Sequence, residues 1–243
     1  GSFGNGTGIR NYSDTDYFAA IPKENLSNDS ANSLRKVKEA LNATFHNTFG
    51  IEVKSPAVKV PFGDSASETL EITPCKFRGI LKTPVGNFGA YEIPDGAGGW
   101  INSSPEAHNK YVRQHDERLG FKLKALIRFI KAWKYYNNVP ISSFYLELRI
   151  TEYAEPKPGI VYDLSIKSII NKLLTIELAD IQDPMGISGY IEACSTNVKH
   201  NEAISKLTTA LGRAEKAIVY RERNLDKSFE CWNLFFNNQF PDR

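Results

Sequence analysis

The chain has 243 residues, of which 41% are hydrophobic and 24% are charged, and its formal net charge is +2 at pH 7. This composition is typical of a globular protein with enough chain for one large domain or two small ones. The small net charge argues against duplex binding through a broad basic surface, and no apolar run approaches the roughly 20 residues of a membrane span. The three cysteines (Cys75, Cys194 and Cys231) lack CxxC spacing, which favours free thiols in a reducing cytoplasm over disulfides or a zinc site.

The chain begins with small residues that are followed by two carboxylates. Residues 1–7 are rich in Gly and Ser and predict a turn whose backbone N–H groups suit a phosphate. Asp14 and Asp16 follow, in a strand expected over residues 14–21. Side chains at i and i+2 of a strand point to the same face, so these two carboxylates converge, and such a pair suits a hard divalent cation. The opening therefore indicates phosphoryl or nucleotidyl transfer.

The rest of the first hundred residues predicts a small α/β or α+β domain. Apolar residues at helical spacing predict a helix over residues 34–49, ended by Gly50. Short segments of β-branched and apolar residues predict strands at 51–54, 57–62 and 69–75, with a hairpin turn at 63–65. The glycine-rich stretch at 95–99 is the best candidate for a linker. We therefore expect a first domain over residues 1–100.

A site for two metal ions needs a third carboxylate from another strand. Glu71 is the preferred candidate, because it lies between Leu70 and Ile72 in the middle of an expected strand, where an unpaired charge is costly. Glu68 is nearer the turn and is expected to be solvated, and Asp64 is a weaker alternative.

After residue 100 the pattern becomes helical. Ser104 and Pro105 are suited to cap and begin a helix, and an apolar stripe runs from Leu119 to Trp133. Further helices are expected at 162–178 and 201–220, followed by a short segment at 229–236. The four histidines are scattered without metal-ligand spacing and are expected to be structural. These features predict a second, helical domain over residues 101–243.

Motifs spread in order along the whole chain resemble those of the polymerase-β-like nucleotidyltransferases, and more specifically the bacterial cGAS/DncV-like group (CD-NTases, with the SMODS domain). They are Gly1-Ser2 with Gly6-Thr7, Ser13-Asp14-x-Asp16, Leu70-Glu71-Ile72-Thr73-Pro74, and residues 100–105, 128–133, 141–147 and 232–241. The chain departs from the family in two ways. Members more often have Asp where this chain has Glu71. They also carry a helix before the Gly-Ser turn, and we expect the first domain, residues 1–100, to lack that helix.

The resemblance implies an α+β fold, in which a mixed-sheet catalytic domain and a helical domain similar to that of oligoadenylate synthetases enclose a nucleotide cleft. It assigns Asp14, Asp16 and Glu71 as catalytic metal ligands for Mg²⁺ or Mn²⁺. The residues expected to bind ATP or another NTP are Gly1, Ser2, Lys131, Ser142, Ser143 and Phe144, with Lys131 and Ser143 on the triphosphate and Phe144 against a base. Simpler interpretations also exist. Lys131 fits an ordinary surface lysine, Phe144 a core residue, the two serines helix caps, and Gly1-Ser2 a cloning remnant.

By the same resemblance, the expected function is synthesis of a cyclic di- or trinucleotide second messenger, with release of pyrophosphate, in bacterial anti-phage (CBASS) signalling. A downstream effector protein would receive the product in the cytoplasm, and neither a membrane nor DNA or RNA is expected as a partner. One alternative is an enzyme that makes a linear oligonucleotide or modifies RNA or a small molecule. Another is a catalytically silent nucleotide sensor.

Overall fold

The computed structural model describes residues 2–12, 14–63 and 68–240. The chain divides into two compact units: unit 1 runs to Tyr111 and includes Met185–Ser188, and unit 2 contains Val112–Pro184 and the chain from Gly189 onward. Helix α3 (Pro105–Arg118) contributes residues to both units and begins at the proline expected to start it. The mixed α+β composition confirms the predicted fold class. Within the described part of the chain, no helix is long and apolar enough to cross a bilayer.

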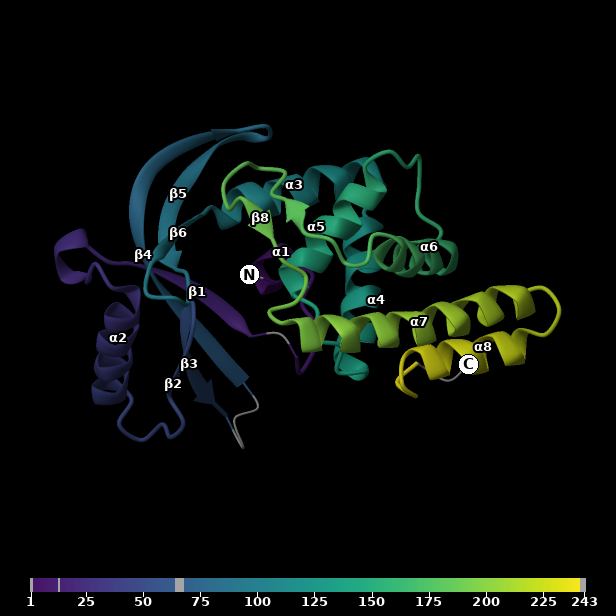
Figure 1. Cartoon of the computed structure of the whole chain (residues 1–243), viewed down its shortest axis with the longest axis horizontal. Helices are drawn as coiled ribbons and strands as arrows, with labels where there is room; N and C mark the ends of the chain where they lie inside the picture. Colours follow the sequence, from purple (N-terminus) through teal and green to yellow (C-terminus); the bar gives the residue numbers. More distant parts are fainter. Residues whose placement is uncertain (1, 13, 64–67, 241–243) are drawn as a thin grey trace. The chain divides into compact units, whose positions relative to one another are not determined.

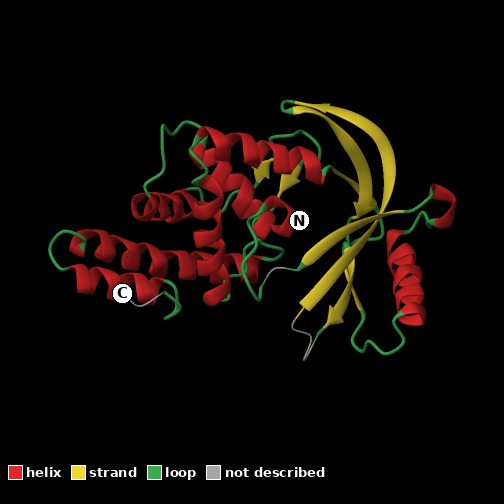
Figure 2. Cartoon of the chain, turned by 180° about the vertical axis from the view of Figure 1, so that it is seen from behind, coloured by secondary structure: helices red, strands yellow, loops and turns green. Residues whose placement is uncertain are grey.

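Unit 1 is built on a single mixed sheet (Figures 1 and 2). Its strands are β1 (Thr15–Ala20), β2 (Glu52–Lys54), β3 (Ala57–Phe62), β4 (Glu68–Thr83), β5 (Gly86–Pro94) and β6 (Trp100–Ser103). They follow the order β2-β3-β4-β5-β6 with antiparallel neighbours, while β1 pairs with β4 in parallel. The first half of β4 pairs with β3 and β1, and its second half pairs with β5. The expected strands are confirmed, although β4 extends well beyond the segment predicted for it.

Helix α2 (Ser30–Thr44) covers one face of this sheet. Its apolar stripe forms a core with strand residues, including Leu34 with Val58 and Val60. The carboxylate of Asp29 caps the helix by accepting a 2.8 Å hydrogen bond from the Ala31 amide. The prediction that the helix continues to residue 49 is wrong in its last turn. Residues 44–48 are weak helix formers, and the 90% exposed Phe49 contributes nothing to the core.

The glycine-rich stretch at 95–99 is not a linker between the units. It connects β5 to β6, which pair with each other in the sheet of unit 1. Asp95 organises the turn, because its Oδ1 accepts hydrogen bonds from the amides of Ala97 (2.7 Å) and Gly99 (2.9 Å). An Asx-type turn of this kind has the same composition as a flexible linker, which is why the sequence suggested one.

Unit 2 is mainly helical. Its helices after α3 are α4 (Leu123–Tyr136), α5 (Ser143–Ala154), α6 (Tyr162–Thr175), α7 (Asn197–Tyr220) and α8 (Leu225–Phe235), with a short β7 (Ile181–Gln182) and β8 (Tyr190–Ile191) pair. The predicted apolar stripe is buried in α4, where Leu126, Ile130 and Trp133 are at most 1% exposed. Gly120 interrupts the helical run before α4 in a left-handed conformation (φ 64°). Helix α5 was not expected as a helix.

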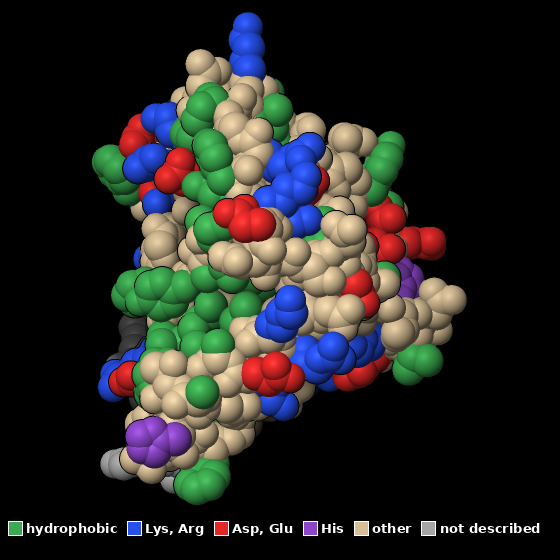
Figure 3. All heavy atoms as spheres, turned by 90° about the vertical axis from the view of Figure 1, so that its left-hand side faces the viewer, with side chains coloured by type: hydrophobic (Ala, Val, Ile, Leu, Met, Phe, Trp, Pro, Cys, Tyr) green, Lys and Arg blue, Asp and Glu red, His purple; other side chains and the backbone are tan. Residues whose placement is uncertain are grey.

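The face of unit 1 seen in Figure 3 carries Lys and Arg side chains among Asp and Glu side chains, together with a group of hydrophobic ones. On this face, positive and negative charges therefore alternate and form no continuous basic surface.

Candidate functional site

The three predicted carboxylates lie on adjacent strands of unit 1. In the parallel pairing of β1 with β4, Asp16 and Glu71 are register partners, and Asp14 lies one residue before β1. Register partners in a parallel pair present their side chains on the same face, as do residues two apart. Burial raises the pKa of Glu71, the carboxylates of Asp14 and Asp16 raise it further, and Lys54 opposes them. The structure thus gathers the three acids into one electrostatically coupled group.

The chemistry of this group fits a hard divalent cation. The Glu71 side chain is hydrogen-bonded to Asp14, and a hydrogen bond between two carboxyl groups requires a proton that a cation would replace. Oxygen ligands of this kind are those that Mg²⁺ prefers. Within the described residues, however, no three His, Cys, Asp or Glu side chains are arranged closely enough to hold a metal ion. Glu68 is exposed, as expected, and Asp64 is outside the described residues.

The N-terminal segment forms a short helix instead of an open turn. Ser2–Asn5 is α1, and the chain leaves it through Gly6, which has a φ of 69°. The amides of Gly6 and Thr7 donate to the carbonyls of Phe3 (3.0 Å) and Ser2 (2.9 Å). These two amides are therefore used within the segment and not held out toward a phosphate. The role of Ser2 remains a prediction, and Gly1 lies outside the described residues.

Lys131 lies in the interior of unit 2. It is 0% exposed, and its Nζ donates a 2.7 Å hydrogen bond to Oε1 of Glu147 on α5, forming a buried ion pair. The expectation of an ordinary surface lysine is therefore wrong. The structure also gives Lys131 a counterion that already neutralises its charge.

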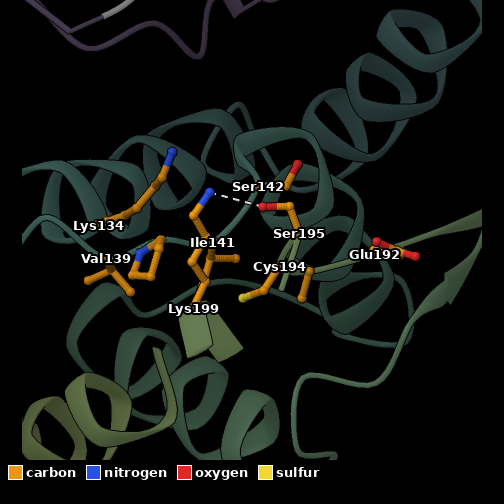
Figure 4. Close-up of a pocket in the computed structure, with 10 residues that line it drawn as sticks. Lys134, Val139, Ile141, Ser142, Glu192, Cys194, Ser195 and Lys199 are labelled. Atoms are coloured by element: carbon orange, nitrogen blue, oxygen red, sulfur yellow. Dashed lines mark hydrogen bonds between the residues drawn. The ribbon is translucent and has the colours of Figure 1, made fainter. Parts of the chain in front are cut away.

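A pocket of about 390 Å³ lies beside α4, α5 and the start of α7 (Figure 4). It is lined by Lys134, Val139, Pro140, Ile141, Ser142, Glu192, Ala193, Cys194, Ser195 and Lys199. Of the residues predicted to bind nucleotide, Ser142 lines this pocket directly. Its hydroxyl also caps α5 by accepting from the Tyr145 amide at 3.3 Å, so the cap interpretation holds as well.

Ser143 is joined to the same pocket through Lys134. The Lys134 ammonium donates a 2.8 Å hydrogen bond to Oγ of Ser143, and the Tyr135 hydroxyl lies 3.1 Å from the same oxygen. Phe144 follows at the start of α5 and is 38% exposed, so it is not a core residue. The sequence motifs did not select Lys134 or Lys199 as functional residues. Their spacing carries no signal, because they come from two helices, α4 and α7, that are far apart in the sequence.

No protein-family model matches the chain. It is 27% identical over 155 residues to a Bacillus cereus (strain VD146) protein named "Probable cyclic nucleotide synthase", a match that covers 62% of this chain and 46% of that protein. The chain thus spans less than half the length of this curated relative.

Solved structures give the fold. The structure of E. coli MS115-1 CdnC with ATP superposes with a TM-score of 0.76 at 18% identity, covering 100% of this chain and 83% of CdnC. The chain has the fold of the CD-NTases. Vibrio cholerae DncV, a cyclic AMP-GMP synthase solved with the linear intermediate pppA(3′,5′)pG, superposes with a TM-score of 0.74 at 15% identity, covering 100% of this chain and 69% of DncV. The CD-NTase fold confirms the resemblance that the sequence motifs indicated.

Proposed function

We propose that this chain is the catalytic core of a metal-dependent nucleotidyltransferase that makes a cyclic di- or trinucleotide from ATP or other NTPs. The observation that carries the proposal is the group formed by Asp14, Asp16 and Glu71 on a CD-NTase fold, where the carboxylates of Asp14 and Asp16 raise the cost of ionising Glu71. The curated relative named as a cyclic nucleotide synthase and the likeness to CdnC and DncV support the same activity.

Asp14, Asp16 and Glu71 would hold Mg²⁺ or Mn²⁺. The chemistry that such a cation would supply is activation of an acceptor hydroxyl and neutralisation of phosphate charge. Because β1 and β4 hold the carboxylates on one face of the sheet, the strand pairing would fix the position at which phosphate charge is neutralised. In the transfer, an acceptor-ribose oxygen forms a bond to the α-phosphorus while the bond to pyrophosphate breaks. A second transfer closes the ring.

The polar and aromatic residues at the start of α5 supply binding. Ser142 and Ser143 offer hydroxyl groups to the donor phosphates, and the partly exposed Phe144 offers a ring face to a base. Holding the reactants in place in this way lowers the entropic cost of reaching the transition state. We further propose that the product acts in bacterial anti-phage (CBASS) signalling in the cytoplasm, where an effector protein receives it.

The test is incubation of the protein with radiolabelled NTPs and Mg²⁺ or Mn²⁺, followed by phosphatase. A ring has no terminal phosphate, so cyclic product stays labelled and resistant. The control is a Asp14→Ala/Asp16→Ala double variant, which we expect to make none. Phosphatase-sensitive product would support the linear alternative, and NTP binding without turnover in either metal would support the sensor. Equal yields from wild type and double variant would overturn the carboxylate assignment.

A further inference from the structure

One face of the sheet in unit 1 carries two lysines beside the three carboxylates. Asp16 on β1 is the register partner of Glu71 on β4, and Glu71 is in turn the register partner of Lys59 on β3. Lys59 pairs with Glu52 on β2, and Lys54 lies two residues after Glu52 on the same short strand. Register partners, and residues two apart on a strand, share a face of the sheet. Both lysines therefore lie on the face that carries the carboxylates.

Lys54 is the lysine whose charge acts on the carboxylates. Burial and the carboxylates of Asp14 and Asp16 raise the pKa of Glu71, and the ammonium of Lys54 opposes them. Lys54 is exposed, so it acts through space and is not part of the core. The same field would act on any ligand of this group, because a nearby positive charge repels a cation and attracts an anion. Lys54 thus offsets part of the attraction between the acids and a free divalent cation.

The opposite face of the same sheet carries a lysine suited to be a control. Helix α2 covers that face and packs against Val58 and Val60. These two residues flank Lys59 in β3, so their side chains point to the face opposite to that of Lys59. Lys36 is an exposed residue of α2. The sheet lies between this helix and the carboxylates, so the charge of Lys36 should have little effect on them.

We propose that Lys54 is a positioning residue that makes the group of Asp14, Asp16 and Glu71 favour a cation bound to polyphosphate over the free cation. Its ammonium weakens the attraction of the acids for a bare divalent cation. It also attracts the negative charge of phosphates that arrive together with the cation in a metal–nucleotide complex. Metal binding is thereby tied to the arrival of the nucleotide. This inference rests on the proposed function, because that function requires both the cation and the nucleotide.

The experiment measures binding of free Mn²⁺ to the full chain by electron paramagnetic resonance, and binding of the Mn²⁺–tripolyphosphate complex by calorimetry, both without turnover. Tripolyphosphate has the phosphate charge of an NTP and no base. We expect Lys54→Gln to bind free Mn²⁺ about threefold more tightly than wild type and the complex about threefold more weakly, as for one charge acting through solvent. An Asp14→Ala/Asp16→Ala double variant should lose the Mn²⁺ bound at this site and so identifies it.

Two further variants and a salt series separate the effect of charge from a structural effect. Lys54→Arg keeps the positive charge and should bind both ligands as wild type does. Lys36→Gln removes the same charge from the opposite face of the sheet and should leave both affinities unchanged. Raising the ionic strength from about 0.05 M to about 1 M should remove the difference between Lys54→Gln and wild type, because salt screens an exposed charge.

Opposite shifts for the two ligands are a result that a purely structural role would not give. The proposal is overturned if either affinity is unchanged in Lys54→Gln, if both shift in the same direction, or if Lys36→Gln shifts them equally. It is also overturned if wild type binds no Mn²⁺ that depends on Asp14 and Asp16. Failure of the proposed function has a different signature, in which Lys54→Gln gives the opposite shifts but no metal yields a transfer product.

Discussion

The buried Lys131–Glu147 pair gives the sharpest prediction about stability. Lys131 is 0% exposed and Glu147 is 9% exposed, and their charged atoms are 2.7 Å apart. Lys131→Met alone would leave a buried carboxylate without its cation, and Glu147→Leu alone would leave a buried ammonium without its anion. Each single change should cost about 3–5 kcal/mol of unfolding free energy. Replacing both at once should cost little or even stabilise unit 2, because two apolar side chains of similar volume have no desolvation penalty.

The assay is urea denaturation of the full chain, followed through tryptophan fluorescence. Trp133 and Trp232 are buried in unit 2 and report on the unit that holds the pair, whereas Trp100 belongs to unit 1. The three variants and wild type complete a double-mutant cycle. Additive losses, in which the double variant loses the sum of the two single losses, would refute the predicted coupling of the two charges. Single losses below about 1 kcal/mol would also refute it, because such values are typical of exposed ion pairs.

Two further predictions concern the proposed site. Glu71→Gln should raise the melting temperature of the metal-free protein at pH 7 while reducing nucleotidyl transfer at least about 100-fold, as expected for loss of a charged catalytic group. Because the pKa of Glu71 is raised in the folded protein, its ionisation destabilises the folded state as pH rises from the ordinary carboxyl pKa to the raised one. The gain from Glu71→Gln should therefore disappear near pH 4, where the carboxyl group is protonated in the folded protein. An equal gain at both pH values would contradict this account. Phe144→Ala should weaken ATP binding about tenfold without affecting tripolyphosphate, because stacking involves the base alone. Equal losses for the two ligands in calorimetry would rule out a stacking role.

Local patterns predicted the elements of the fold well where a single physical cause dominates. Pro105 begins α3, and the apolar stripe ending at Trp133 is buried as its periodicity indicated. Predictions were wrong where different structures share one composition. The turn held by Asp95 resembles a linker, and the weak helix formers before Phe49 continue a helical pattern that the backbone does not follow.

The carboxylates of unit 1 could be selected from the sequence, but the lysines of the unit 2 pocket could not. Asp16 and Glu71 were selected by strand position and by the cost of an isolated charge, and the register of β1 with β4 pairs them. Lys134 and Lys199 could not be selected in this way. The pocket that they line is formed by segments far apart in the sequence, and it therefore depends on tertiary packing. The burial of Lys131 depends in the same way on the position of Glu147 one helix later.

The pairing of strand β4 determines how easily local opening of the sheet would disturb the proposed site. It carries Glu71, and its two halves are paired with β1, β3 and β5, so most of the sheet is joined through this one strand. Glu71 can move only if the ladders on both sides of β4 open, whereas Asp14 and Asp16 lie at the start of β1, which pairs with β4 alone. The pocket of unit 2 is different, because loop residues between secondary-structure elements form much of its wall. Glu71 is therefore anchored by two strand ladders, whereas loop backbone between helices and strands forms much of the pocket wall in unit 2.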